Sequence, residues 1–112
     1  MIQSWKQHEK DIQEILGLDS TICSGNKFHD PGDAVDNDRE SIFPIVADCK
    51  FTEGKSFSVS SKALSQWADK AAEMGKRFIM PVRLSPRGSN PQDYVVIGLH
   101  DFAELLEMAR RS

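Results

Sequence analysis

The chain has 112 residues and a mass of 12.6 kDa, so we expect residues 1–112 to form a single domain with one modest core. With 39% hydrophobic and 28% charged residues, its composition excludes a disordered chain. It has no apolar run near the ~20 residues of a membrane helix and no signal-peptide stretch, so we expect a cytoplasmic protein without membrane contact. The net charge of −3 disfavours a general nucleic-acid binder, although bound divalent cations would reverse the sign of an acidic site.

The N-terminal segment has the spacing of an amphipathic helix. The helix is expected to follow a capping serine, Ser4, and to end at Gly17. Its inward stripe is expected to consist of three apolar residues at helical spacing: Trp5, Ile12 and Leu16. Glu9 falls on the same stripe, where a carboxylate is either partly exposed at the helix edge or held inside for a purpose.

Three strands are expected next, at residues 20–23, from residue 33 onward, and along the apolar run 42–47. The segment 24–32 between the first two is rich in turn formers. Asp48 and Lys50 close the apolar run, and strand alternation places both on one face. A buried acid and a buried ammonium are costly to desolvate without partners, which makes this pair the main candidate for a site.

The second half predicts a short strand at 56–59, a helix capped by Ser60 or Ser61 and ended by Gly75, and strands at 78–84 and 94–99. Pro81 within the first of these longer strands indicates a sheet edge or a bulge. The residues expected to face inward from the middle helix are Leu64, Trp67, Ala68, Ala71 and Met74. A last helix is expected to be capped by the pair Asp101 and Glu104, with Phe102, Leu105, Leu106 and Ala109 packed on the sheet. A helix crossing between strands of one sheet predicts an α/β fold, with a mixed sheet flanked by helices on both faces.

The acids and the lysine fit the chemistry of phosphodiester hydrolysis. Mg²⁺ prefers oxygen ligands from one or two carboxylates, and it supplies an activated water and charge neutralisation. Asp33 and Asp48, on neighbouring strands, are able to meet across a ladder, and Glu9 could approach from the first helix. Lys50 is placed to hold the attacking water or the scissile phosphate.

Taken together, these residues resemble a known family. Glu9, Ser24-Gly25, Gly32-Asp33 and Asp48-Cys49-Lys50, in this order, resemble the motifs of PD-(D/E)XK nucleases. Within that superfamily the pattern is most similar to archaeal-type Holliday junction resolvases, including phage-encoded relatives. The resemblance covers Trp5 to Leu84 and implies a restriction-endonuclease-like fold. It also implies a magnesium-dependent endonuclease in which Mn²⁺ substitutes for Mg²⁺.

The resemblance implies a role for each matching position. Glu9, Asp33 and Asp48 would bind the metal, and Lys50 would assist catalysis. Ser24 would lie on a loop near the scissile phosphate. Two departures are the glycine in place of the usual proline before Asp33 and the aspartate in place of the commoner glutamate at position 48.

Several questions stay open from the sequence. Asp36 or Asp38 could replace Asp33 as a metal ligand. The residues expected to contact DNA are Ser24, Gly25, Lys27, Lys55 and Lys62. A four-way junction has two-fold symmetry and needs two nicks, which favours a homodimer. The alternatives are a catalytically silent DNA- or protein-binding module with the same fold, and a nuclease acting on flaps, single strands or duplex ends.

Overall fold

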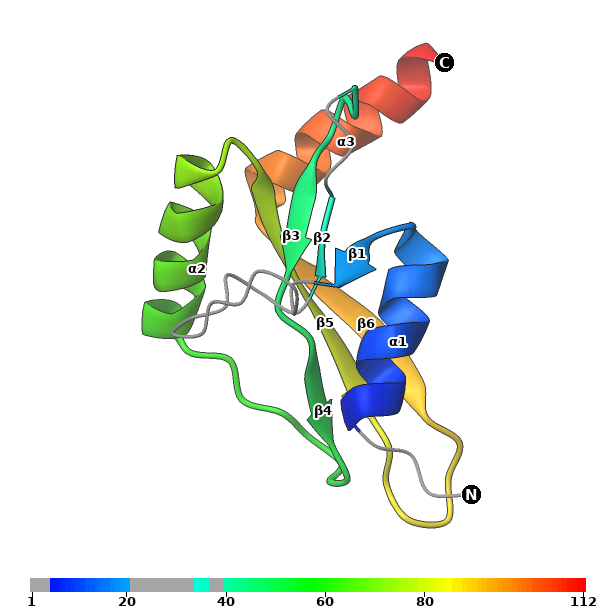
Figure 1. Cartoon of the computed structure of the whole chain (residues 1–112). Coiled ribbons are helices and arrows are strands. Elements are labelled where there is room, and N and C mark those ends of the chain that lie inside the picture. The colour runs from blue at the N-terminus through cyan, green and yellow to red at the C-terminus, as the bar shows by residue number, and fades with distance from the viewer. Residues whose placement is uncertain (1–4, 21–33, 37–39) are drawn as a thin grey trace.

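The computed structural model describes residues 5–20, 34–36 and 40–112. Its elements follow in the order α1 (Trp5–Leu16), β1 (Asp19–Ser20), β2 (Ala34–Val35), β3 (Ile45–Ala47), β4 (Lys50–Thr52), α2 (Ser61–Glu73), β5 (Arg77–Leu84), β6 (Gln92–Ile97) and α3 (Leu99–Arg111) (Figure 1). None of the helices within these ranges has the length and apolarity needed to span a membrane.

The strands of the described ranges join one mixed sheet. β1, β2 and β3 pair in antiparallel order, β3 and β4 both pair with β5 in parallel, and β6 pairs antiparallel with β5. A parallel pair needs a long crossover, which α2 supplies between β4 and β5. The expected α/β fold with a mixed sheet is therefore confirmed.

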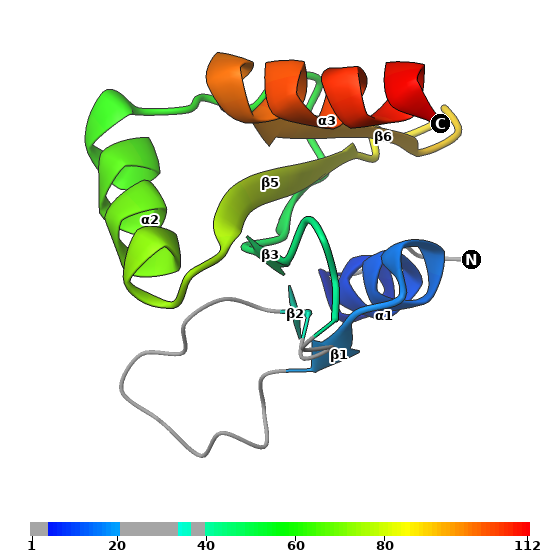
Figure 2. The same cartoon turned by 90° about the horizontal axis from the view of Figure 1, so that it is seen from above.

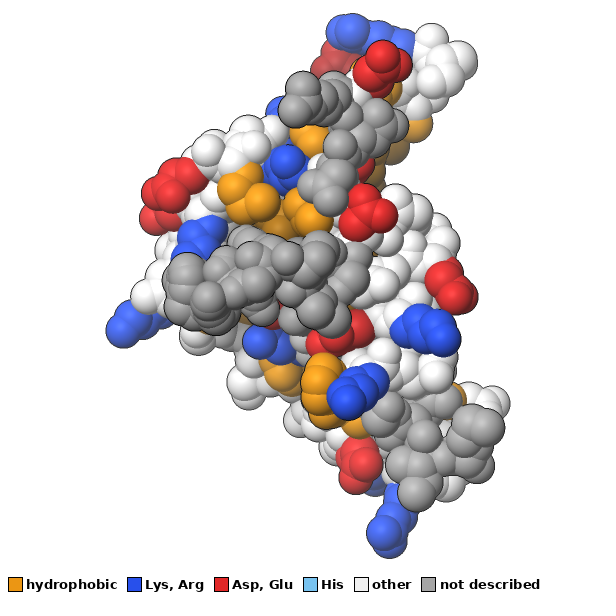
Figure 3. Space-filling view, in the orientation of Figure 1, with side chains coloured by type: hydrophobic (Ala, Val, Ile, Leu, Met, Phe, Trp, Pro, Cys, Tyr) orange, Lys and Arg blue, Asp and Glu red, His pale blue; other side chains and the backbone are white. Residues whose placement is uncertain are grey.

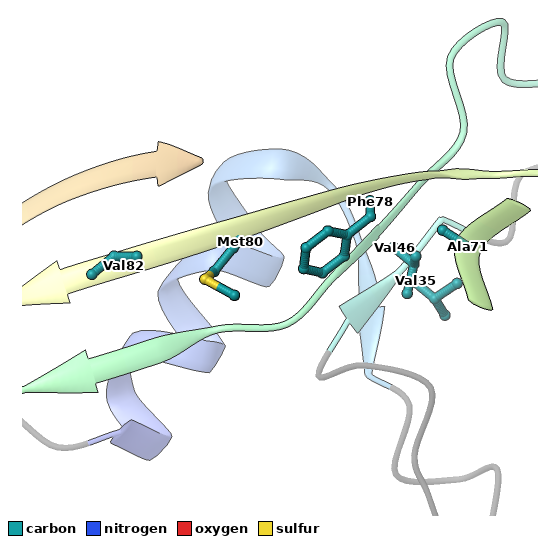
Figure 4. Close-up of a cluster of buried hydrophobic side chains, with 6 residues drawn as sticks. All are labelled: Val35, Val46, Ala71, Phe78, Met80 and Val82. Atoms are coloured by element: carbon teal, nitrogen blue, oxygen red, sulfur yellow. The ribbon is translucent and has the colours of Figure 1, made fainter. Parts of the chain in front are cut away.

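Helices cover both faces of the sheet, as the sequence predicts. On one face lie Phe78, Met80 and Val82 of β5, which alternate with residues of the other face. They form the main core cluster with Val35, Val46 and Ala71 (Figure 4). Trp67 of α2 stacks on Phe78 there, with ring centroids 5.6 Å apart and an angle of 8° between the rings. The other face carries α1, and Figure 2 shows the strands between α1 and α2.

The ends of α1 and α2 agree with the local signals. Gly17, directly after α1, has a φ of 68°, which a glycine adopts without strain. The Ser60 Oγ accepts a hydrogen bond of 3.1 Å from the Ala63 N–H and so caps α2. The inward stripe of α1 is corrected, because the buried side chains are His8 and Ile12, whereas Trp5 is 56% exposed. The helix therefore presents the side that carries His8 and Ile12 to the sheet, and Trp5 and Leu16 lie away from the buried side.

Three further expectations are wrong. Residues 56–59 form no strand and lead as an irregular segment into the cap of α2. Pro81 lies in a strand paired on both sides, not at an edge. α3 begins after Gly98 without a side-chain cap, since Asp101 and Glu104 instead form ion pairs with Arg77 of β5. The expected packing of α3 holds only in part, because none of its apolar side chains is fully buried and Leu106 is half-buried.

A buried arginine ties α1 to the two longest strands. Arg83 is 6% exposed and forms ion pairs with Asp93 of β6 at 2.7 Å and with Asp11 of α1 at 2.9 Å. The hydrogen bonds to Asp93 are bidentate, through Nε and Nη2. They lower the pKa of Asp93 and raise that of Arg83. Two carboxylates therefore balance one buried guanidinium.

We expect Asp93→Asn to lower the free energy of unfolding by about 2 kcal/mol. The loss is smaller than for a fully buried pair, because Asp93 is partly exposed and Asp11 still faces Arg83. Urea denaturation at neutral pH measures this difference. The control is Glu107→Gln, which removes the exposed pair with Arg111 and should cost at most about 0.5 kcal/mol. Equal effects of the two substitutions would contradict the role of Arg83.

The same cluster predicts acid sensitivity. The pKa of Asp93 is lowered chiefly by its hydrogen bond with Arg83, and that of Asp11 by its hydrogen bond with Gln7 and then by Arg83. Each contributes stability that is fully present above the ordinary value of 3.8 and is lost as the pH falls through the lower folded value. Melting temperature should therefore fall steeply below about pH 4, and less steeply in Asp93→Asn. Parallel curves for the two proteins would contradict this assignment.

Candidate functional site

The candidate site lies at an interruption between two strands. β3 ends at Ala47 and β4 begins at Lys50, but both pair with β5 in the same register. Ala47 is opposite Ile79 and Lys50 is opposite Val82, so the chain advances three residues on each side. The expected single strand is thus continuous in register but broken at Asp48 and Cys49.

Pro81 explains the break. The Arg77 N–H donates to the Pro44 carbonyl and the Ser85 N–H donates to the Thr52 carbonyl, both across a spacing of 33 residues. With the same spacing, the carbonyl of Asp48 would accept a hydrogen bond from the N–H of residue 81. A proline has no N–H, so this ladder bond is missing. The backbone of Asp48 therefore keeps its bond to β5 on one side only, where its own N–H donates to the Ile79 carbonyl at 3.1 Å.

Asp48 and Lys50 form an ion pair at this break. Nζ of Lys50 lies 3.0 Å from Oδ2 of Asp48, and the Asp48 side chain is 8% exposed against 39% for Lys50. The contact lacks the geometry of a hydrogen bond, and the buried Oδ2 accepts none from the described residues. A buried carboxylate oxygen without a hydrogen bond is costly unless a further cation or donor reaches it. The expected pairing of these two residues on one face is therefore what the structure shows.

The pair lies on the face of the sheet that α2 covers. Lys50 is opposite Val82, which belongs to the core cluster of that face, and residues paired across a ladder share a face. Asp48 is bound to Lys50 and so lies on the same side.

Several expected site residues lie outside the described ranges: Ser24, Gly25, Lys27, Asp33 and Asp38. Of these, Asp33 directly precedes β2 in the sequence. The β2–β3 ladder pairs Ala34 with Ala47, and Asp48 is the residue directly after β3. Asp36, the competing acid on the other side of β2, is half-buried, and its N–H donates to the Ile45 carbonyl at 2.9 Å.

Glu9 lies on α1, which packs against β2 and β4. Its side chain is half-buried. Because α1 occupies the opposite face from Lys50, a carboxylate from this helix would reach the pair around the interrupted part of the sheet. The structure thus places Glu9 on an element next to the site and joins Asp48 only with Lys50.

The two described lysines expected to contact DNA are both exposed. Lys55 follows β4 at a turn, and Lys62 lies in the first turn of α2. Figure 3 shows basic and acidic side chains interspersed over the visible face, rather than gathered by sign. The described part of the chain contains no cluster of three or more His, Cys, Asp or Glu side chains that could hold a metal.

His8 is a residue that the sequence reasoning missed. It is fully buried, and its Nε2–H donates to the Pro81 carbonyl at 3.2 Å, which fixes the tautomer because a carbonyl only accepts. Burial lowers the pKa of this imidazole. The sequence signal was available, since His8 lies four residues before Ile12 at helical spacing. Through this bond α1 is attached to β5 at the proline beside the strand break.

Comparison with known proteins identifies no relative, since no protein-family model, no curated protein and no solved structure matches the chain. The support for the candidate site therefore comes from its own geometry.

The ion pair gives a prediction for stability. Lys50→Met should lower the free energy of unfolding by about 1–2 kcal/mol, because it leaves the buried carboxylate of Asp48 without its cation. Asp48→Asn should cost no more than about 0.5 kcal/mol, because a neutral amide is easier to bury than a charge. In the Asp48→Asn background, Lys50→Met should lose most of its effect. The exposed Lys55→Met is the control, and an equal loss in all three single variants would contradict the pairing.

Proposed function

We propose that this protein is a magnesium-dependent endonuclease with a restriction-endonuclease-like fold that cleaves DNA. The observation that carries the proposal is the buried Asp48 carboxylate, paired with Lys50 at a strand break that Pro81 imposes. A nearly buried acid with an oxygen that accepts no hydrogen bond from the described residues is a costly arrangement for stability alone. A functional requirement is a reason to retain it.

We propose that a hard divalent cation binds beside Asp48. Asp48 offers a carboxylate oxygen, and we propose that Asp33 and Glu9 supply the others, with Mn²⁺ able to replace Mg²⁺. The next step of the β2–β3 register supports Asp33, because Asp48 is the residue directly after the partner of Ala34. The metal would supply charge neutralisation and a more acidic bound water. Asp36 and Asp38 remain the competing ligands on that side of the ladder.

In this proposal Lys50 and Asp48 have distinct roles. The ammonium of Lys50, partly exposed, is able to reach a phosphate oxygen or the attacking water while its partner anchors it. Its charge would stabilise the negative charge that develops at phosphorus. The backbone phosphates would be held by Lys55 and Lys62, and by Ser24, Gly25 and Lys27 of the loop before β2. These contacts read the shape of DNA rather than its sequence.

The proposed substrate is a four-way junction, acted on by a homodimer in the cytoplasm. The support is the resemblance of the motifs to Holliday junction resolvases, together with the two-fold symmetry of the junction. A single chain with one site makes one nick, and a symmetric pair presents two sites at a fixed separation. Flaps, single strands and duplex ends are the competing substrates.

The second candidate is a catalytically silent binding module with the same fold. The net charge of −3 and the interspersed charges on the visible face favour this candidate. An enzyme that cleaves DNA is expected to present a dominant positive face to the phosphates, and a silent module does not need one. The response of the protein to magnesium distinguishes the two candidates. A silent module should show no magnesium-dependent change in melting temperature or DNA affinity.

Cleavage of a labelled four-way junction under Mg²⁺ tests the proposal. Asp33→Asn and Asp48→Asn should abolish cleavage, and Lys50→Ala should reduce the rate by about 10²–10³, the range seen when one transition-state donor is removed. DNA binding should remain, because phosphate contacts by other residues are unchanged. The parent should also cut the junction faster than a flap, a single strand or a linear duplex.

Two matched substitutions serve as controls. Asp69→Asn removes an exposed acid of α2, and Asp36→Asn tests the competing ligand beside β2; both should leave the cleavage rate within about twofold of the parent. A loss of activity in Asp36→Asn but not in Asp33→Asn would move the metal ligand to Asp36. Equal cleavage by the parent and by all three site variants would show that the proposed function is wrong.

A further inference from the structure

An apolar groove lies on the sheet face opposite the Asp48–Lys50 pair. It has a volume of about 470 Å³ and is lined by residues of α1, β5, β6 and α3. Its floor includes Ile79 and Pro81 of β5, which alternate with the residues of the main core cluster. Its sides and rim include Ile15, Leu16, Val95 and Leu105.

The apolar side chains around this groove are unusually exposed. Ile15 is 67% exposed, Val95 52% and Leu16 42%, and Leu105 of α3 is exposed as well. Phe102, one turn before Leu105, extends the same side of α3 and is also exposed. Single exposed apolar residues are ordinary, but a contiguous set around one groove marks an interaction surface.

The groove is suited to burial without an uncompensated charge. Asp93 is the one acidic or basic residue among its described lining, and both of its oxygens are already bonded to Arg83. Interface centres avoid unpaired charges because desolvating them is costly. The occupant is therefore expected to be an apolar protein surface rather than an ionic ligand or DNA.

β6 adds an open strand edge beside the groove. Among the described strands it pairs with β5 alone, and its sequence QDYVVI holds no lysine or proline. Natural edge strands usually carry such residues, which prevent pairing with another chain. The single charge of this strand, Asp93, is bound to Arg83. The edge thus lacks the usual protection against association.

We propose that a second copy of this chain covers the groove in a two-fold symmetric dimer. The apolar area approaches that of a stable dimer: five side chains near half exposure offer roughly 400 Å² of apolar surface per copy. They are Ile15, Leu16, Val95, Phe102 and Leu105. A standard interface buries ~800 Å² per partner, of which roughly 60% is apolar, so most of the required apolar surface is present.

Self-association also fits the shape. The groove is bounded by two helices that each present exposed apolar residues, Ile15 on α1 and Phe102 with Leu105 on α3. A two-fold axis near the groove would bring the helix ridge of one copy to the groove of the other, so that the same residues meet from both sides. The Asp48–Lys50 pairs, on the opposite faces of the sheets, would remain outside the interface. The role of the dimer, which is to present two cleavage sites, rests on the proposed function. The location of the interface is argued from the groove alone.

Sedimentation equilibrium of the full chain tests the interface directly. The parent should have twice the 12.6 kDa mass of the chain at micromolar concentration. Ile15→Glu and Val95→Glu should each weaken dimerisation at least roughly tenfold, because two-fold symmetry places every introduced charge at the interface twice. Both positions are exposed, so the melting temperature of the monomer should change little. Val59→Glu is the control, since Val59 is 40% exposed but does not line the groove, and this variant should remain dimeric.

Hydrogen exchange of the unmodified protein provides a second measurement that needs no variant. The amides of β6 should lose protection on dilution, and those of α2 should not. A monomeric parent, or a dimer that both groove variants leave intact, would overturn the proposed interface. A loss of protection on dilution that is confined to the amides of α2 would also overturn it.

The outcome is independent of nuclease activity. Asp48→Asn should remain dimeric, because it lies on the other face of the sheet. A dimer that cuts no DNA would overturn the proposed function and retain the interface, whereas a monomer that cuts junctions would do the reverse.

Discussion

The missing N–H of Pro81 is the constraint on which the candidate site depends. β5 lies between β3–β4 and β6, so each of its backbone groups faces a neighbour, and a proline there removes one bond from the interior of the sheet. The register assigns that bond to Asp48. The Pro81 carbonyl in turn accepts a hydrogen bond from His8 and so attaches α1. One residue thus interrupts the strand that presents Asp48 and Lys50 and also positions the helix that carries Glu9.

The alternation of β5 separates two kinds of surface. Its even-numbered residues face α2 and the main core, and Lys50 lies on this side. Its odd-numbered residues face α1, where Arg83 is balanced by two carboxylates and Ile79 underlies the apolar groove. The two proposed functions, hydrolysis of DNA and association of two copies, would therefore use opposite faces of one sheet and would not compete for the same residues.

Local signals in the sequence predicted much of the fold. Gly17 and Ser60 fix helix ends through backbone conformation and capping, and both depend only on neighbouring residues. The meaning of Pro81 could not be read this way, because it depends on the register between distant strands. The same holds for Asp101 and Glu104, which resemble a capping pair but bind Arg77 of β5. For the site, strand alternation correctly joined Asp48 with Lys50, whereas the placement of Asp33 and Ser24 stays a prediction.

The central claim is that a divalent metal binds at Asp48, and paramagnetic NMR with Mn²⁺ tests it most directly. Sub-stoichiometric Mn²⁺ should broaden the amide signals of Ala47, Asp48 and Cys49 first, because paramagnetic relaxation falls steeply with distance from the ion. Excess Mg²⁺ should restore these signals, and Asp48→Asn should lose the effect. Broadening that is centred on exposed acids such as Asp69 and Glu73, or that is the same in Asp48→Asn, would contradict a metal site at the strand break.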